Sequence, residues 1–499
     1  MIIYQRTKAE FINDVREDRL ADSLEDSVQN LTGRRTSESE YKSWRNSSIY
    51  VRNVLDDPRI PNNAGVALEY HIPSSAKRID VLITGYDELG EANVIIIELK
   101  QWSKAEVTNK DAIVLSYVGR GNQELIHPCY QAWSYSSLLE SFNTYVYENN
   151  IGLKPCAYLH NYPVTENALT DVRYKEYIDK APIFRQKEGN KLADFISKYI
   201  RKGDQGEVLY EIENGKLKPS KALASSLASM LRGNEEFVLI DEQKEVYETT
   251  LERSTETQTK NVIIVEGGPG TGKSVVGINL LVEANKRRLV CQYVTRNSAP
   301  REVYRTKLQG DFTNLAINSL FKGSGSYMQS KDGEIDLLIV DEAHRLNEKS
   351  GMFKKGENQV KEIIHAAKTS VFFIDAHQQV TFLDIGSVEE IEKWAAYFNA
   401  NITRMELPSQ FRCSGSDGYL SWVDNSLGIS ETANQDLDQS YDFRVYKNPT
   451  QMRSEIQRLD SKETPARVLA GYCWEWVSRR NPLQFDIQFP EYDFHCRWN

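Results

Sequence analysis

An apolar run that ends at Glu266 leads directly into a glycine-rich loop and a Lys-Ser pair. The residues of this loop are Gly267, Gly268, Pro269, Gly270, Thr271, Gly272, Lys273 and Ser274. We expect a strand before the loop and a helix over 275–284, an order that gathers backbone N–H groups and the positive helix end around a phosphate. Lys273 would reach the β- and γ-phosphates of ATP, and Ser274 would ligate Mg²⁺. An ordinary glycine-rich turn is the alternative, and the preceding apolar run weighs against it.

Two adjacent carboxylates follow a second apolar run, over residues 337–340. Asp341 suits the water shell of Mg²⁺, and Glu342 suits a general base that orients the attacking water. A surface Asp-Glu pair at the start of a helix is the alternative, since acidic residues favour first turns. Together with the loop, the pair predicts hydrolysis of a nucleoside triphosphate.

A second set of chemically useful residues lies in the N-terminal third. Asp80 interrupts one apolar run, and a second run ends in Glu98-Leu99-Lys100 after a polar hairpin. Residues two apart on a strand share a face, so Glu98 and Lys100 should lie together. Neighbouring strands could place Asp80 and Glu98 on one divalent cation, with the backbone carbonyl of Leu99 as a further ligand and Lys100 beside the attacking water. The charged edge of an ordinary sheet is the alternative.

This arrangement resembles the core of PD-(D/E)xK nucleases, although the usual proline is not in its place. Gln131 and Tyr135 match the Gln-x-x-x-Tyr helix of RecB-like members, and Glu40 matches the acid that such nucleases often carry on an upstream helix. The resemblance implies Mg²⁺- or Mn²⁺-dependent phosphodiester cleavage, with Asp80, Glu98 and Lys100 as catalytic residues and Glu40 as an additional metal ligand. For Glu40, a solvated helix acid remains the alternative.

The C-terminal half resembles superfamily 1 helicases in the order of its motifs. Gln243 matches the adenine-binding Q motif, and residues 293–299 match motif Ia, which touches single-stranded nucleic acid. Gln378 matches the γ-phosphate sensor of motif III, and Arg412 matches the motif IV arginine. The amino-acid sequences of the later motifs resemble more closely those of bacterial helicase-like ATPases related to the C-terminal part of Schlafen proteins. The blocks that carry this likeness are 372–375, 410–420 and 469–476.

These sites require an α/β chain in several parts. We expect an N-terminal helical segment (1–37), a restriction-endonuclease-like α/β/α core (38–200), a linker (201–236), a RecA-like ATPase lobe (237–400) and a partial second RecA-like lobe (401–499). After Arg412 we find neither the Gln-Gly-x-Glu block of motif V nor an arginine-bearing motif VI. We therefore expect a truncated second lobe that another copy of the chain or a partner completes.

The composition limits the class of protein. A formal net charge of −10 excludes a uniformly basic nucleic-acid coat but allows a focused basic patch. The six cysteines form no CxxC pair, which argues against a zinc ribbon and favours reduced thiols in the cytoplasm. No apolar run is long enough to span a bilayer, so we expect no membrane partner.

Combined, these features predict an ATP-dependent nuclease-helicase that acts on nucleic acid, with DNA favoured because the cleavage motif resembles DNA repair and restriction nucleases. A role in anti-phage defence follows by analogy alone. The main alternative is an ATP-gated nucleic-acid-binding switch or sensor with an inactive nuclease-like module. A metabolic kinase is the third possibility, and Gln378 and Arg412 speak against it.

Overall fold

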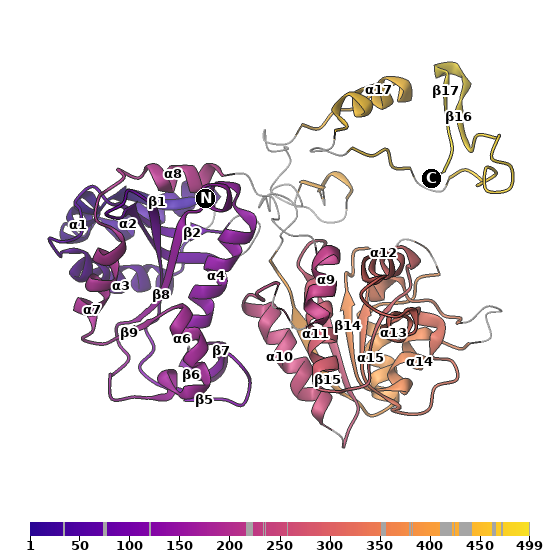
Figure 1. The fold of residues 1–499 in the computed structure, drawn as a ribbon, viewed down its shortest axis with the longest axis horizontal. Coiled ribbons are helices and arrows are strands. Elements are labelled where there is room, and N and C mark those ends of the chain that lie inside the picture. The colour runs from indigo at the N-terminus through magenta and orange to yellow at the C-terminus, as the bar shows by residue number, and fades with distance from the viewer. Residues whose placement is uncertain are drawn as a thin grey trace. The chain divides into compact units, whose positions relative to one another are not determined.

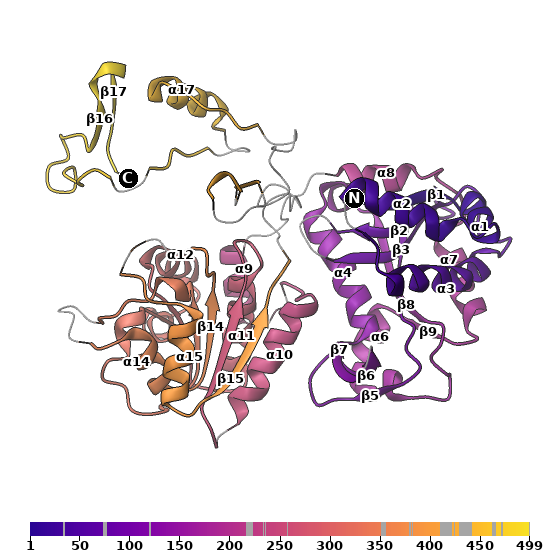
Figure 2. The same cartoon turned by 180° about the vertical axis from the view of Figure 1, so that it is seen from behind.

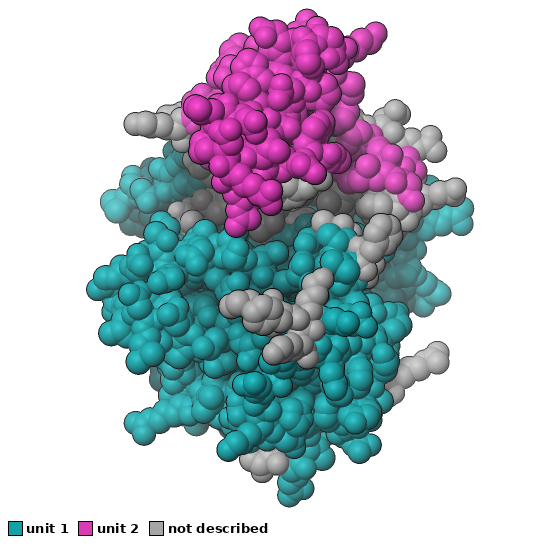
Figure 3. Space-filling view, turned by 90° about the vertical axis from the view of Figure 1, so that its right-hand side faces the viewer, with its two compact units in different colours: residues 1–420 teal, residues 421–499 magenta. Residues whose placement is uncertain are grey.

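The protein is described by a computed structural model. It describes residues 1–32, 35–72, 77–118, 121–215, 223–232, 234, 236–256, 258–350, 356–378, 381, 383–409, 422–423, 425–428, 442–461, 466–470 and 473–498. The chain forms two compact units, Met1–Leu420 and Ser421–Asn499, which Figure 3 distinguishes by colour.

The N-terminal part is built on a six-stranded sheet in the order β1-β2-β3-β4-β8-β9 (Figure 1). Its strands are β1 (Ile2–Thr7), β2 (Gly65–His71), β3 (Arg78–Tyr86), β4 (Ala92–Leu99), β8 (Gly152–Leu159) and β9 (Ile183–Arg185). Neighbours from β1 to β4 are antiparallel, whereas β4, β8 and β9 run parallel. Val81 of β3 pairs with Ile97 of β4, and this register brings the Asp80 end of β3 beside the Glu98 end of β4.

Helices cover both faces of this sheet. One side holds α1 (Lys8–Arg16), α2 (Leu20–Thr32), α3 (Glu38–Leu55) and α7 (Gly189–Tyr199), and the other holds α4 (Pro128–Phe142), α5 (Thr144–Glu148) and α8 (Glu207–Asn214). The two central strands alternate accordingly: Ile95 and Ile97 pack into the first core, Val94 and Ile96 into the second. Strands buried on both faces read as continuous apolar runs, which explains the Val-Ile-Ile-Ile sequence of β4.

A small antiparallel sheet lies beside this core. It contains β5 (Ala105–Val107), β6 (Ile113–Val118) and β7 (Gly121–Ile126), and α6 (Lys175–Lys180) packs nearby against α4. Short 3₁₀ turns occur at Ala168–Thr170, Val172–Tyr174, Ser324–Ser326, Ala343–Arg345 and Pro490–Tyr492.

The following part is a fully parallel six-stranded sheet in the order β12-β11-β13-β14-β10-β15. Its strands are β10 (Asn261–Glu266), β11 (Cys291–Thr295), β12 (Phe321–Lys322), β13 (Ile335–Asp341), β14 (Ala367–Ile374) and β15 (Asn401–Glu406). Helices α9 (Leu223–Leu231), α10 (Asp241–Thr255), α11 (Lys273–Lys286), α12 (Ser298–Leu308) and α13 (Asn314–Leu320) share one core, and α14 (Gln359–Ala366) and α15 (Val388–Tyr397) share the other (Figures 1 and 2). Ligands of open parallel sheets bind at the carboxyl ends of the strands, where both predicted carboxylates lie.

Three sequence expectations differ from the structure. Residues 2–7 were expected to be helical, but they form β1, because Ile2 and Ile3 are buried on opposite faces of the sheet. The expected linker 201–236 contains α8, whose buried Val208 and Ile212 pack on that sheet. Residues 401–406 were expected to open a second lobe, but β15 pairs with β10 and extends the first lobe.

The second unit contains little regular structure in the part of it that is described. Helix α17 (Pro449–Leu459) and the antiparallel pair β16 (Ile487–Phe489) and β17 (Phe494–Cys496) are its main elements. A partial second RecA-like lobe therefore stays a prediction. Within the described ranges of the whole chain, no helix combines the length and apolarity needed to cross a bilayer.

Candidate functional sites

The glycine-rich loop connects β10 to α11, as expected. Gly270 has φ 81° and Gly272 has φ 87°, in the left-handed region that favours glycine. A Cβ atom at Gly272 would also lie 2.2 Å from the side-chain amide of Gln243. Glycine at 272 is thus required both by backbone conformation and by the close approach of α10.

Lys273 turns its side chain back into this loop. Its ammonium donates hydrogen bonds to the carbonyls of Gly267 and Gly268, the latter at 2.6 Å. The side chain is buried, and it opens α11, where backbone N–H groups lack helical partners. A phosphate at this helix end would meet both the ammonium and the free N–H groups.

Asp341 ends β13 and faces the start of α11. Ser274 Oγ donates a hydrogen bond to its carboxylate at 2.9 Å, and the buried Tyr293 hydroxyl of β11 donates a second, very short one. Burial raises the pKa of Asp341 above its usual range. The Glu342 backbone N–H also donates to this carboxylate at 3.0 Å. All three donors are neutral, and a carboxylate beside a serine hydroxyl suits Mg²⁺.

Glu342 follows in a left-handed backbone conformation, with φ 54°. Its carboxylate lies 3.0 Å from His344 Nε2. The other ring nitrogen, His344 Nδ1, accepts the Asp375 backbone N–H at 3.3 Å, so Nε2 carries the proton and donates to Glu342. Sequence analysis assigned no role to His344, whose position two residues after Glu342 was the available signal.

The other residues predicted to contact the nucleotide lie on different parts of the chain. Gln243 of α10 donates from Nε2 to the Thr271 carbonyl at 3.1 Å, and its Oε1 accepts the Ile240 backbone N–H at 3.3 Å. Gln378 lies just beyond β14, where its backbone N–H bonds to Asp375. Arg412 lies outside the described residues.

The N-terminal candidate residues line one cavity of about 390 Å³. Asp80, Glu98, Lys100, Gln131 and Tyr135 all contribute to its wall. The Lys100 ammonium pairs with Glu98 Oε1 at 2.6 Å, and the Leu99 backbone N–H donates to Asp80 Oδ2 at 2.7 Å. The structure thus brings together five residues that sequence analysis placed in one site.

This cavity concentrates ionisable groups in a desolvated place. Burial raises the pKa of Glu98 to about 8, with the charge of Asp80 as the second cause, and burial also raises the pKa of Asp80. For Lys100, burial lowers the pKa, but the charges of Glu98 and Asp80 outweigh burial, so its pKa is raised. Glu98 Oε2 is buried and has no hydrogen-bond partner among the described residues, so a cation fits beside it.

Gln131 and Tyr135 lie on one face of α4. Gln131 Nε2 donates to the Tyr135 hydroxyl at 2.8 Å, and that hydroxyl donates to Asp241 Oδ2 at 2.6 Å. Asp241 opens α10 of the following lobe, so the predicted Gln-Tyr pair contacts a residue that sequence analysis did not assign to this cavity.

Glu40 makes a different contact from the one expected of a metal ligand. It accepts a hydrogen bond from Arg78 Nη1 at 2.6 Å, and Arg78 also pairs with Glu69 at 2.8 Å. Glu69 is buried, and burial together with the charge of Asp80 raises its pKa to about 7. Sequence analysis missed Glu69, because it lies inside an apolar strand without a motif. A metal-binding role for Glu40 stays a prediction.

Within the described ranges, no group of three or more His, Cys, Asp and Glu side chains is arranged to hold a metal ion. An ion at Asp80 and Glu98 would therefore complete its shell with waters and a backbone carbonyl. Mg²⁺ accepts such a shell, because it keeps several waters in most protein sites.

Comparison with known proteins gives one family match. Residues 260–499 match the family described as Schlafen group 3, DNA/RNA helicase domain. A search among curated proteins gives no match.

Two solved structures show weak likeness. One is described as a DNA replication initiation factor, with 19% identity, covering 43% of this chain and 59% of that one, at a TM-score of 0.20. The other is the replication initiator DnaA bound to AMPPCP and single-stranded DNA, with 18% identity, covering 44% and 60%, also at 0.20. The chain spans about 60% of the length of these structures, and a TM-score of 0.20 supports no statement about fold or function. The family match shows that residues 260–499 are similar to a helicase domain.

Proposed function

We propose that this chain is an ATP-dependent nuclease-helicase that acts on nucleic acid, with DNA as the favoured substrate. The observation that carries the ATPase assignment is the contact of Ser274 with Asp341 at the carboxyl edge of a parallel sheet, directly behind the Lys273 loop. The match of residues 260–499 to a helicase domain supports nucleic acid as the partner.

In the proposed reaction, the Lys273 ammonium leaves the Gly267 and Gly268 carbonyls and binds the β- and γ-phosphates. Ser274 and Asp341 would hold Mg²⁺, which would supply positive charge beside the phosphates. Glu342 orients the attacking water and takes its proton, and His344 fixes the direction of the Glu342 carboxylate. Gln378 and Arg412 complete the site as γ-phosphate contacts, as their resemblance to helicase motifs implies.

For the N-terminal cavity we propose phosphodiester hydrolysis. Asp80 and Glu98 would hold Mg²⁺ or Mn²⁺, which supplies charge stabilisation and a more acidic water. The Lys100 ammonium lies where it can stabilise a leaving oxygen. The water oxygen bonds to phosphorus and loses a proton to the solvent, the P–O bond to the departing strand breaks, and the released oxygen gains a proton from the solvent, so that one water is consumed.

The test is an incubation of the purified chain with labelled single- and double-stranded DNA and RNA. It is run with and without ATP, with Mg²⁺ or Mn²⁺, and with the Asp80→Asn and Lys273→Ala variants. We expect metal-dependent cleavage that Asp80→Asn abolishes, and ATP hydrolysis that Lys273→Ala abolishes. Cleavage that survives Asp80→Asn would refute the assignment of the cavity.

One observation favours an alternative. The Lys100 ammonium already neutralises Glu98 at 2.6 Å, as it would in a nuclease-like module that binds nucleic acid without cutting it. The chain would then be an ATP-gated switch or sensor. Tight, nucleotide-dependent DNA binding without cleavage under any metal condition would support this alternative.

The biological setting belongs to the same proposal. We infer a cytoplasmic protein with a role in anti-phage defence. Plaque counts in cells with the wild-type chain, Asp80→Asn or Lys273→Ala would test the defence role.

A further inference from the structure

Helix α10 contacts both candidate sites through neighbouring residues. Gln243 donates to the Thr271 carbonyl of the nucleotide loop at 3.1 Å. Two residues earlier, Asp241 accepts the Tyr135 hydroxyl at 2.6 Å and lines the N-terminal cavity. The two sites are therefore connected by the first turn of a single helix.

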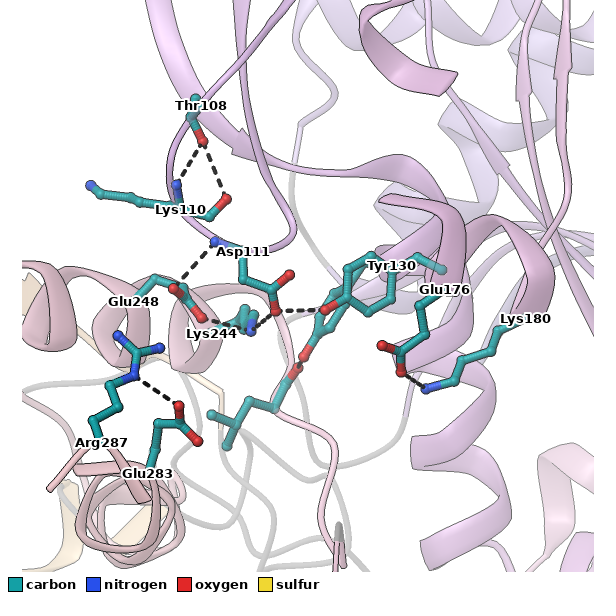
Figure 4. Close-up of polar contacts among 12 residues, drawn as sticks. Thr108, Lys110, Asp111, Tyr130, Glu176, Lys180, Lys244, Glu248, Glu283 and Arg287 are labelled. Atoms are coloured by element: carbon teal, nitrogen blue, oxygen red, sulfur yellow. Dashed lines mark hydrogen bonds and ion pairs between the residues drawn. The ribbon is translucent and has the colours of Figure 1, made fainter. Parts of the chain in front are cut away.

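Further polar contacts join this helix to the N-terminal part (Figure 4). Lys244 is buried and pairs with Asp111 and with Glu248, each at 2.8 Å. The segment that enters α10 is held too, because the Tyr130 hydroxyl donates to the Leu239 carbonyl at 2.6 Å. The pair with Glu248 is buried and lies within α10, whereas the Asp111 side chain, which links the helix to the N-terminal part, is half exposed.

The first turn of α10 gives the cavity an acidic wall. Asp241 and Glu242 of this turn line it together with Glu245 of the next turn, and Asp80 and Glu98 line the same cavity. Negative charges on this wall oppose the entry of a phosphodiester, because a confined site of low dielectric strengthens repulsion between like charges. Lys77 also lines the cavity and pairs with Asp241 at 3.3 Å and with Glu242, so it holds these carboxylates in the wall and offsets part of their charge, and Glu245 adds a further acid.

Asp241 is held in an unfavourable state. Its backbone has φ 29°, in the positive region that non-glycine residues avoid. Its side chain is more than nine-tenths buried, and Oδ1 has no hydrogen-bond partner within the described ranges. Strained residues of this kind persist only where their surroundings hold them, and they occur at switch regions.

We propose that the first turn of α10 is an acidic cover over the nuclease cavity and that ATP binding releases it through Gln243. This regulation rests on the proposed nuclease function of the cavity. Both ends of the Gln243 amide are already bonded, Oε1 to the Ile240 N–H and Nε2 to the Thr271 carbonyl. If Gln243 rotates to bind an adenine, its Oε1 loses the hydrogen bond from the Ile240 backbone N–H. That hydrogen bond caps the start of α10. The strained Asp241 then relaxes away from the cavity, and a substrate phosphate can approach Asp80 and Glu98.

The first experiment measures this release directly, by amide hydrogen exchange of residues 240–245 in the full chain. Exchange is compared without nucleotide and with a saturating non-hydrolysable ATP analogue and Mg²⁺. We expect faster exchange with the analogue in the wild-type chain and no change in Lys273→Ala, which should not bind it. Unchanged or slower exchange in the wild-type chain would overturn the proposal, whether or not the cavity cuts DNA.

The second experiment tests the acidic wall with the triple variant Asp241→Asn, Glu242→Gln, Glu245→Gln. Its matched control, Glu88→Gln, Glu140→Gln, Glu334→Gln, removes the same charge from exposed positions outside the cavity. We expect the analogue to raise DNA cleavage by the wild-type chain and the control about 5–150-fold, the usual range of coupling between sites. The cavity variant should cleave at the raised rate without nucleotide. A cavity variant that still needs nucleotide would overturn the proposal. Absence of cleavage in every sample would count against the nuclease function, and the exchange result would then decide the coupling.

Discussion

Replacing Lys273 with alanine should weaken ATP binding by a margin that follows from its present contacts. The ammonium makes two charge-assisted hydrogen bonds to the carbonyls of Gly267 and Gly268. In the ATP complex these bonds are exchanged for bonds to phosphate, so only the difference between the two sets contributes to affinity. Hydrogen bonds to charged groups contribute about 1.5–3 kcal/mol each, and phosphate adds a full charge that a carbonyl lacks.

We therefore expect a net loss of about 2–3 kcal/mol, which corresponds to a Kd for ATP raised roughly 30- to 140-fold. The assay is equilibrium titration of a fluorescent ATP analogue in the presence of Mg²⁺. Lys286→Ala is the matched control, because this lysine ends the same helix and is exposed. Thermal unfolding of both variants would confirm that the loop change leaves the fold intact.

A change in Kd below threefold, in a folded Lys273→Ala protein, would refute the reasoning. It would mean that the ammonium does not leave the loop carbonyls when nucleotide binds. An equal loss in Lys286→Ala would refute it as well, because the effect would then come from general charge rather than from the loop.

Three further outcomes follow from the described contacts. Glu342→Gln should keep ATP binding and lower hydrolysis about 10²- to 10⁴-fold, as expected for a lost general base; a loss below tenfold in steady-state turnover would place the base elsewhere. Tyr293→Phe removes one of the two hydroxyl donors of the buried Asp341. The pKa of Asp341 should therefore rise further, and half-maximal ATP hydrolysis should need more Mg²⁺. The control Tyr304→Phe, which changes the ring beside Tyr293, should alter the Mg²⁺ requirement little. The raised pKa of Glu98, about 8, means that a metal ion must displace a proton below that pH. Mn²⁺ affinity measured without nucleotide should therefore rise roughly tenfold per pH unit from pH 6 to 8 and then level off, and a flat profile, or one unchanged in Glu98→Gln, would contradict this assignment.

The sequence predicted the α/β class and the strands that carry the sites, because buried parallel strands read as uninterrupted apolar runs. The loop before α11 was also predictable, since its glycines and its Lys-Ser pair are local features. These residues needed no knowledge of distant contacts, and the structure places Ser274, Lys273 and Asp341 around one point.

Contacts across long separations could not be predicted in this way. Tyr135 and Asp241 are 106 positions apart and meet through a hydrogen bond that no periodicity encodes. The same holds for β1, which is short and polar at one end and becomes a strand only because β2 offers an edge to pair with. Glu69 was missed for a related reason: an acid within a buried strand gains meaning only from Arg78 and Asp80 beside it.

The two candidate sites differ in how their buried carboxylates are neutralised, and this difference bears on the order of events. Asp341 is held by neutral donors, so in the proposed nucleotide site its negative charge would be available to Mg²⁺. Glu98 already has the Lys100 ammonium at 2.6 Å, and a metal ion there must compete with that cation and with a proton. If both sites act as proposed, the first could bind Mg²⁺ and nucleotide as it stands, whereas the second would have to be rearranged before it acts. An ATPase lobe whose first helix turn lies in the wall of the second site is well placed to make that rearrangement depend on nucleotide.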